Sequence, residues 1–265
     1  HQYRRVDRMV PAPEQVERAA VMLAAAELPM IHAGSGIIHA GAYDELRRVS
    51  EILHAPVTTS WAARGVLPET CETSIPMPYM KLNHEVRNDS DLVLVVGSRL
   101  GETDWWGKAP YWRRPSEQQM IQVDVDGHVL GSNKPAALTA LADAKLFLAA
   151  LADALVARTG RMNLDARRRK VAKYRDTARA ERAKLDEKLA DMAVPMNTGH
   201  VAHTCQQVFP EGSVLVADGG NTAVWAMMFH EMRVPNTILS TFKFGMLGAG
   251  AAQATGAAVA RPDVP

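Results

Sequence analysis

Asp91-Leu-Val-Leu-Val-Val-Gly97 is the stretch of sequence that decides the fold. Five consecutive aliphatic residues that end at a glycine are typical of a strand buried on both faces, as in a parallel sheet. Similar strands are expected around it at residues 29–34, 55–59 and 120–125. Apolar residues at helical spacing lie between and after these strands, at 13–26, 42–53 and 142–158. This alternation predicts an α/β protein with a doubly wound parallel sheet, covered by helices on both faces.

A second α/β unit is expected after a charged stretch. Residues 159–195 are rich in Arg, Lys, Glu and Ala and poor in large apolar residues, which predicts an exposed helical linker. Strands are then expected at 213–217 and 237–240, and helices at 197–209, 222–232 and 251–260. The predicted layout is a connector (1–12), a central Rossmann-like domain (13–158), the linker (159–195) and a truncated second α/β domain (196–265). The sequence ends just after an Ala- and Gly-rich helix, which predicts a fragment.

Composition restricts the class of ligand. Thirty Lys and Arg residues against 29 Asp and Glu residues leave a net charge of +1, so no nucleic-acid partner is expected. No apolar run approaches the roughly 18 residues of a membrane helix, and no signal peptide opens the chain, so no membrane partner is expected. The two cysteines form neither a disulfide framework nor a metal motif. A cytoplasmic protein with a small-molecule ligand is therefore expected.

The glycine turn at Gly34-Ser-Gly36 follows the first strand and is a candidate phosphate site. The alternative is a tight turn with no ligand. The dinucleotide fingerprint fails here because His39 stands where a third glycine belongs, which argues against a nicotinamide dehydrogenase.

Two further residues follow the next strands of the predicted sheet. Arg99, just after Gly97, lies where open α/β sheets bind ligands, and it either faces a phosphate or adenine or pairs with a nearby carboxylate. Asp124 either binds ribose hydroxyls or caps the following turn. Together with the glycines, these residues predict a possible nucleotide site.

A second candidate site lies in the C-terminal part. Asp218-Gly-Gly-Asn-Thr222 again reads as strand, glycine turn and helix, a geometry that suits a diphosphate. Phe244-Gly-Met-Leu-Gly-Ala-Gly250 precedes a helix of small residues, which either packs closely against a neighbour or approaches a cofactor ring. The nine histidines include no H-E-x-x-H motif, so no metal ligand is assigned.

These motifs, in this order, resemble the acetolactate synthase and benzoylformate decarboxylase group of thiamine diphosphate-dependent enzymes. Arg64-Gly-Val-Leu-Pro-Glu69 and Ile121-Gln-Val-Asp-Val-Asp126 look like the central domain of that family. Val216-Ala-Asp-Gly-Gly-Asn221, with Trp225, and residues 245–258 look like the start of its diphosphate-binding domain. The resemblance implies that the chain holds the central domain and the beginning of the last one.

The resemblance also implies the roles of six residues. Gly220, Asn221 and Thr222 would contact the diphosphate of the cofactor. Gly245 would offer its carbonyl to the aminopyrimidine, Met246 would line the ring, and Leu247 would be the apolar wedge that bends the cofactor.

The implied parent protein is a thiamine diphosphate- and Mg²⁺-dependent carboligase (a transferase) or decarboxylase (a lyase) of 2-oxo acids. The family's activating glutamate and its G-D-G metal motif lie outside this sequence, so no catalytic or metal-binding residue is assigned and this fragment is expected to be inactive. A homodimer or homotetramer is implied, and the paired Trp105 and Trp106 would suit such an interface.

One departure from the family concerns a second cofactor. Flavin-binding members carry an acidic and arginine-rich stretch after G-S-R, whereas Leu100-Gly-Glu-Thr-Asp-Trp-Trp-Gly107 stands here. FAD is therefore not expected, and the central domain binds an adenine nucleotide such as ADP or nothing. The alternative function is a non-catalytic adenine-nucleotide-binding module.

Overall fold

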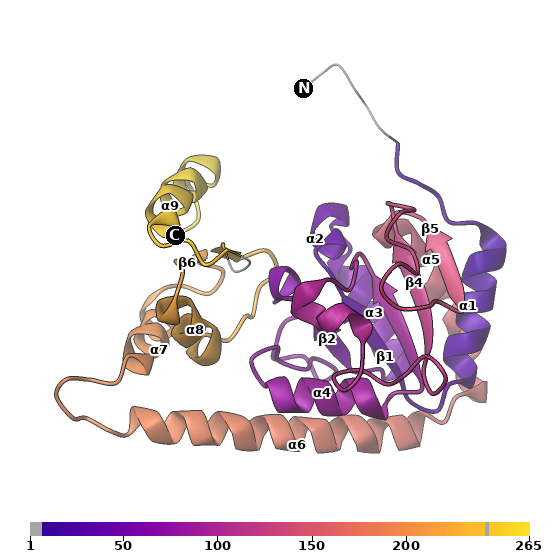
Figure 1. Cartoon of the computed structure of the whole chain (residues 1–265), viewed down its shortest axis with the longest axis horizontal. Coiled ribbons are helices and arrows are strands. Elements are labelled where there is room, and N and C mark those ends of the chain that lie inside the picture. The colour runs from indigo at the N-terminus through magenta and orange to yellow at the C-terminus, as the bar shows by residue number, and fades with distance from the viewer. Residues whose placement is uncertain (1–6, 242–243) are drawn as a thin grey trace.

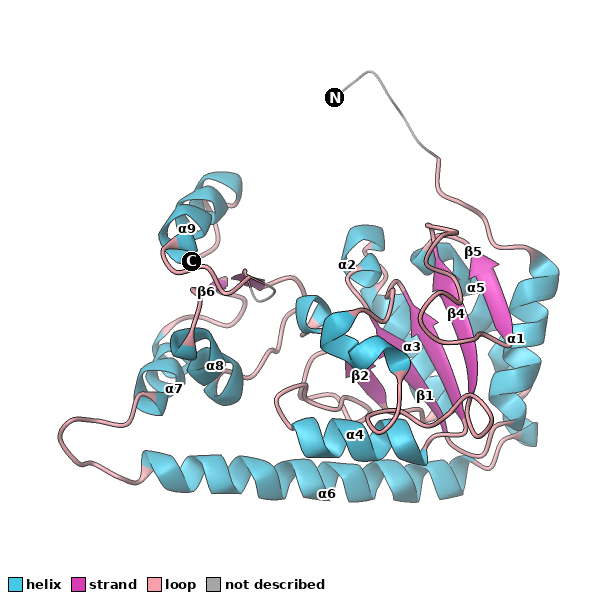
Figure 2. Ribbon diagram, viewed as in Figure 1, coloured by secondary structure: helices cyan, strands magenta, loops and turns pink. Residues whose placement is uncertain are grey.

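The computed structural model describes residues 7–241 and 244–265, and its largest element is a five-stranded parallel sheet (Figures 1 and 2). The strand order is β2-β1-β3-β4-β5, with β3 in the centre. The strands are β1 (Pro29–Ala33), β2 (Val57–Thr59), β3 (Leu92–Val96), β4 (Gln119–Asp124) and β5 (Leu138–Leu141). The prediction of a doubly wound parallel sheet is confirmed, because helices cover both faces.

Alternate residues of the strands form two separate cores. Ile31, Leu94 and Ile121 are aligned across β1, β3 and β4 and pack under α1 (Pro13–Ala25), α3 (Tyr43–Leu53) and α5 (Ala144–Val156). Met30 and Val93 point to the opposite face, under α4 (Met80–Asp89) and α6 (Leu164–Leu189). The sheet is therefore buried on both sides, as the aliphatic run in β3 predicts.

Several elements were not predicted from the sequence. The edge strand β5 contains only four residues and is half exposed, so it lacks the aliphatic run that marks β3. Helix α4 is polar apart from a few positions, and α2 (Gly36–Ala40) is a single short turn after the first glycine turn. Two 3₁₀ segments, η1 (Trp61–Ala63) and η2 (Glu102–Gly107), follow β2 and β3, and a third, η3 (Thr159–Arg161), precedes α6.

The helix predicted within 159–195 is present as α6, but it is not exposed on every side. One stripe of this helix is buried against the sheet's second face and α4, as Figure 1 shows along the lower edge of the molecule. Tyr174 is fully buried and its hydroxyl donates to Asp89, while Ala178 lies one turn further on in the same core. Arg167, 1% exposed, donates to the carbonyls of Leu53, Leu23, Ala24 and Ala26. This narrow buried stripe is not evident from the average composition of residues 159–195, which is highly charged.

The second sheet contains two parallel strands, β6 (Leu215–Ala217) and β7 (Ile238–Ser240). Around it lie α7 (Gly199–Val208), α8 (Asn221–Phe229) and α9 (Ala249–Ala260). These elements match the predicted ones, although β6 is two residues shorter and α8 ends three residues earlier than expected. The domain boundaries at 12, 158 and 195 stay predictions.

A buried ion pair connects the loop after β2, which follows the five-stranded sheet, to the segment after α8, which lies beside the two-stranded sheet. Arg64 donates two hydrogen bonds to Glu69, at 2.7 and 2.9 Å, and both side chains are at most 6% exposed. The backbone N–H of Glu69 donates to the carbonyl of Met232, and the Glu69 carboxylate accepts from the N–H of Met232. Arg64 donates to the carbonyl of His230. The loop after β2 is thereby fixed to the segment after α8.

Candidate functional site

The two glycine loops of the C-terminal part meet at one edge of the second sheet. Because β6 and β7 are parallel, the loops that follow them emerge at the same edge. A side chain on Gly219 would place its Cβ 2.1 Å from the carbonyl oxygen of Gly245, so only glycine allows the two backbones to come this close. A Cβ on Gly220 would lie 3.4 Å from a methyl group of Leu247.

Asp218 fixes this junction by hydrogen bonds. Its carboxylate accepts from the backbone N–H of Gly248 at 2.8 Å and of Gly250 at 3.2 Å, at the start of α9. Donation by the N–H groups of Gly248 and Gly219 lowers the pKa of Asp218, because these bonds favour the charged form. Asp218 therefore acts as a bridge between the loops, a role that the sequence did not assign to it.

The structure brings together the six residues that the resemblance named. Gly220, at φ +70°, precedes α8, and no side chain of the described residues caps this helix end. Asn221 and Thr222 are exposed beside it. On the facing loop, Met246 and Leu247 are 52% and 79% exposed, which is unusual for large apolar side chains. A helix start without a cap, open glycines and exposed apolar side chains fit a diphosphate attached to an organic ring system.

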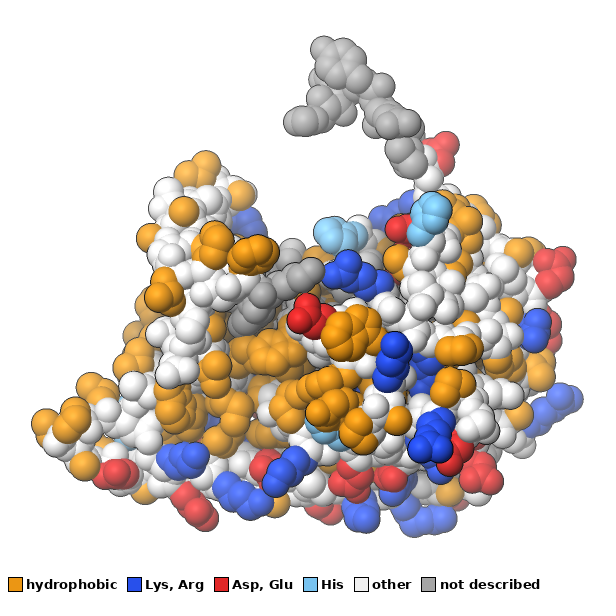
Figure 3. Space-filling view, viewed as in Figure 1, with side chains coloured by type: hydrophobic (Ala, Val, Ile, Leu, Met, Phe, Trp, Pro, Cys, Tyr) orange, Lys and Arg blue, Asp and Glu red, His pale blue; other side chains and the backbone are white. Residues whose placement is uncertain are grey.

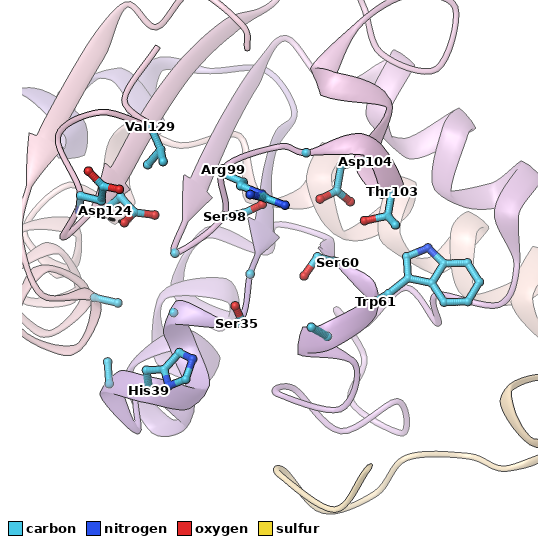
Figure 4. Close-up of a pocket in the computed structure, with 18 of the residues that line it drawn as sticks. Ser35, His39, Ser60, Trp61, Ser98, Arg99, Thr103, Asp104, Asp124 and Val129 are labelled. Carbon is cyan, nitrogen blue, oxygen red and sulfur yellow. Dashed lines mark hydrogen bonds between the residues drawn. The ribbon is translucent and has the colours of Figure 1, made fainter. Parts of the chain in front are cut away.

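The second candidate site is a cleft of about 1130 Å³ at the carboxyl edge of the five-stranded sheet (Figure 4). Its lining includes all five residues of the predicted nucleotide site, namely Gly34, Gly36, Gly97, Arg99 and Asp124. Ser240 at the end of β7, with Thr241 and Met246 from the loop that follows, closes its other side. The cleft therefore lies between the two sheets and reaches the first candidate site.

The structure gives the three glycines of the predicted nucleotide site a packing role. A Cβ on Gly34 would lie 2.1 Å from the carbonyl oxygen of Gly97, and one on Gly36 would lie 2.5 Å from the Cα of Gly97. The N–H of Gly36 donates to the carbonyl of Gly97, so it is not free for a phosphate. Helix α2 has five residues, too few for a strong helix dipole. These observations favour the tight-turn alternative for Gly34-Ser-Gly36.

Arg99 and Asp124 project into the same cleft in Figure 4. Arg99 is exposed and forms no ion pair with any carboxylate of residues 7–241 and 244–265, so the alternative in which it pairs with a nearby carboxylate is wrong. Asp124 accepts from the N–H of Asp126 at 3.0 Å, which confirms the turn-capping alternative for one of its oxygens. Burial raises the pKa of Asp124.

A buried charged cluster beside the cleft was missed by sequence reasoning. Asp104, 3% exposed, lies 3.4 Å from Nε2 of His32 and 3.9 Å from the guanidinium of Arg87. The Arg87 guanidinium lies 4.7 Å from the Trp112 ring, and burial lowers its pKa to about 10. Burial alone would raise the pKa of Asp104, but the charges of His32 and Arg87 hold it below its usual value. The only sequence signal was a histidine inside an apolar strand.

Metal ligands do not gather in the part of the chain that the structure describes, because no three His, Cys, Asp or Glu side chains converge there. None of the described helices is both long and apolar enough to cross a membrane.

The fold and the two sites define a class of protein: a parallel α/β chain with glycine loops at the carboxyl edges of its strands. Comparison with known families narrows this class. The family model described as "thiamine pyrophosphate enzyme, central domain" matches residues 16–151, more than half of the chain. The chain belongs to this family of thiamine pyrophosphate (thiamine diphosphate) enzymes, which confirms the resemblance found in the sequence.

Individual relatives agree with this membership. The chain is 27% identical to the acetolactate synthase large subunit of Corynebacterium glutamicum, with 96% of this chain and 40% of that protein covered. It is 31% identical to a probable 2-ketoarginine decarboxylase of Pseudomonas aeruginosa, with 99% and 44% covered. A putative thiamin diphosphate-dependent enzyme from Mycobacterium smegmatis shares the fold, with a TM-score of 0.70, 20% identity and 98% and 47% covered. The chain thus spans less than half the length of these relatives.

Proposed function

We propose that this chain is part of a thiamine diphosphate- and Mg²⁺-dependent enzyme that acts on small 2-oxo acids. Both a carboligase of the acetolactate synthase type and a decarboxylase fit the names of its relatives, and the carboligase is favoured because acetolactate synthases recur among them. The observation that carries the proposal is the junction at Asp218, which holds an uncapped helix start against a loop of exposed apolar side chains.

Each side of this junction would contact a different part of the cofactor. The first N–H groups of α8, with Asn221 and Thr222, would bind the diphosphate. The carbonyl of Gly245 and the side chains of Met246 and Leu247 would orient the rings and exclude water from them. When bound, thiamine diphosphate supplies an electron sink for cleaving and forming the bond next to a 2-oxo group.

The remaining parts of the proposed site come from outside this chain. Mg²⁺ ligands and the activating carboxylate would be supplied by regions that the longer relatives have in addition, so the 265 residues alone would be inactive. The proposed protein is a cytoplasmic homodimer or homotetramer. Trp106, 44% exposed beside a stack of Trp105 on Tyr111, would contribute to a subunit interface.

A second candidate function is adenine-nucleotide binding in the large cleft. It is favoured by Arg99, whose exposed guanidinium enters the cleft without a carboxylate partner in the described residues. Such a site would exist beside the thiamine site or, in a non-catalytic module, in place of it. Binding of ADP that is lost in Arg99→Gln would support it.

The experiment for the main proposal is a carbon dioxide release assay on a panel of 2-oxo acids. It uses a protein that contains this chain together with the flanking regions of its relatives. Release that requires both thiamine diphosphate and Mg²⁺, and that is absent from the 265-residue chain, is expected. Folded protein that consumes no 2-oxo acid under these conditions would overturn the proposal.

A further inference from the structure

A second cavity, away from the cofactor loops, lies between α6, the loop after β2 and the segment after α8. It measures about 700 Å³, which is within the range of small-molecule sites. Figure 3 shows the charged side chains that follow α6 along the lower edge of the molecule. Five arginines and three acidic residues line the cavity, so its wall carries an excess of positive charge. The arginines are Arg64, Arg175, Arg179, Arg182 and Arg233.

Arg175 is the cation in this wall that lacks a carboxylate. It is half-buried, and its guanidinium donates to the backbone carbonyl of Glu69 at 3.2 Å. No carboxylate of residues 7–241 and 244–265 lies within ion-pair distance of it. Partial burial of a guanidinium without an anionic partner is unfavourable, because the charge loses part of its hydration and gains no opposite charge in return. Arg175 is therefore available to an anionic ligand.

Neighbouring arginines can turn toward the same ligand at little cost. Arg182 and Arg179 lie on the face of α6 that carries Arg175, and each pairs with an acid of its own helix, at 2.8 and 2.9 Å. Partly or fully exposed pairs of this kind contribute little to stability, so breaking them costs little. Arg233 reaches the cavity from the opposite side, where it pairs with Glu231.

Polar atoms without partners also gather at this cavity. Arg64 is 2% exposed, and its Nη1 has no hydrogen-bond partner among the described residues. His203 and His230 line the same cavity, and the Nδ1 atoms of both are buried without a partner. Three buried atoms without a hydrogen-bond partner thus belong to residues of three different segments around one cavity.

Part of the remaining wall is apolar and suits an organic group attached to the anion. The apolar part consists of Tyr79, Pro76, Pro78 and Met228. Inorganic phosphate would fill only a small part of the volume and would leave these side chains without contacts. Guanidinium groups match the oxygens of phosphate in geometry and charge.

We propose that this cavity binds an organic phosphate monoester, with the phosphate on Arg175, Arg182 and Arg233 and the organic body against Tyr79 and the prolines. The ligand would bridge α6, which packs on the five-stranded sheet, and residues 231–233, which lie between α8 and β7 of the second unit. Its binding would add to the Arg64 and Glu69 contact that already joins them. The site is separate from the proposed thiamine site and does not depend on it.

The test is calorimetric titration of phenyl phosphate and of inorganic phosphate into the full chain at constant ionic strength. Phenyl phosphate is expected to bind more tightly, because it also contacts the apolar wall. Arg175→Gln is expected to weaken phenyl phosphate binding by about tenfold or more, since a charge-assisted contact is lost. Arg169→Gln, on the exposed side of the same helix, and Arg99→Gln, in the other cleft, should bind as the wild type does.

Circular dichroism checks that each variant is folded. If Arg175→Gln fails to fold, Arg182→Gln replaces it, because that side chain forms only a local ion pair on α6. Unchanged binding in the folded variant would overturn the proposal. Binding that Arg99→Gln abolishes would place the ligand in the other cleft and would overturn it as well, as would the absence of binding to the wild type.

Discussion

Replacing Arg167 by methionine tests whether α6 is an integral part of the central fold. The guanidinium of Arg167 supplies hydrogen bonds to four carbonyls, three of them at the end of α1 and one at the end of α3. Helix ends leave such carbonyls without partners inside the helix, and a cation there also favours the helix dipole. Methionine keeps the length and apolar stem of the side chain but removes every donor.

The expected loss follows from the burial of these acceptors. Three of the four hydrogen bonds are buried, and each acceptor left without a donor costs about 1 to 3 kcal/mol. Removing a desolvated charge offsets part of this, so Arg167→Met should lower the free energy of unfolding by about 3 to 5 kcal/mol. Urea unfolding followed by circular dichroism measures the change, with an unchanged dependence on urea concentration as the sign that the native and unfolded states stay comparable.

Arg169→Met is the matched control, because Arg169 is exposed on the same helix. Its effect should stay within about 0.5 kcal/mol. A loss below about 1 kcal/mol in Arg167→Met would refute the reasoning, because buried carbonyls without donors must cost more than that. In that case α6 would behave as the exposed linker that its composition suggests.

Three further predictions concern the sites. Gly34→Ala should lower the melting temperature strongly or prevent folding, because the new Cβ would lie 2.1 Å from the Gly97 carbonyl; normal melting would contradict this packing. The native pKa of Asp104 lies below its ordinary value of 3.8, so the ionised carboxylate stabilises the folded state at neutral pH. This stabilisation is lost as the pH falls through the native pKa. The difference in unfolding free energy between wild type and Asp104→Asn should therefore shrink in acid, and a constant difference would refute it. Asp218→Ala should weaken thiamine diphosphate binding in the proposed enzyme, measured by titration, whereas the exposed Asp263→Ala should not.

The sequence predicted those parts of the fold whose signal is local. The run Asp91-Leu-Val-Leu-Val-Val-Gly97 marked the central strand because both of its faces are apolar. The burial of α6 was not predictable in the same way. It depends on a narrow buried stripe around Tyr174 and on hydrogen bonds from Arg167 to backbone carbonyls more than 100 residues away in the sequence. Short elements such as β5 were missed because they are stabilised by their neighbours in the sheet.

The candidate sites show the same division. Glycine turns were visible, but the sequence did not reveal that Gly34 and Gly97 pack against each other or that Asp218 bridges two loops. Those contacts join residues distant in the chain. The cluster of His32, Asp104 and Arg87 has the same origin, because each residue comes from a different element.

The central claim is that this chain contributes part of a thiamine diphosphate site. Calorimetric titration of thiamine diphosphate with Mg²⁺ tests it most directly, with two proteins side by side. One is this chain, and the other carries it together with the regions that its relatives have in addition. The account predicts saturable, Mg²⁺-dependent binding to the longer protein alone. No binding to the folded longer protein would contradict it.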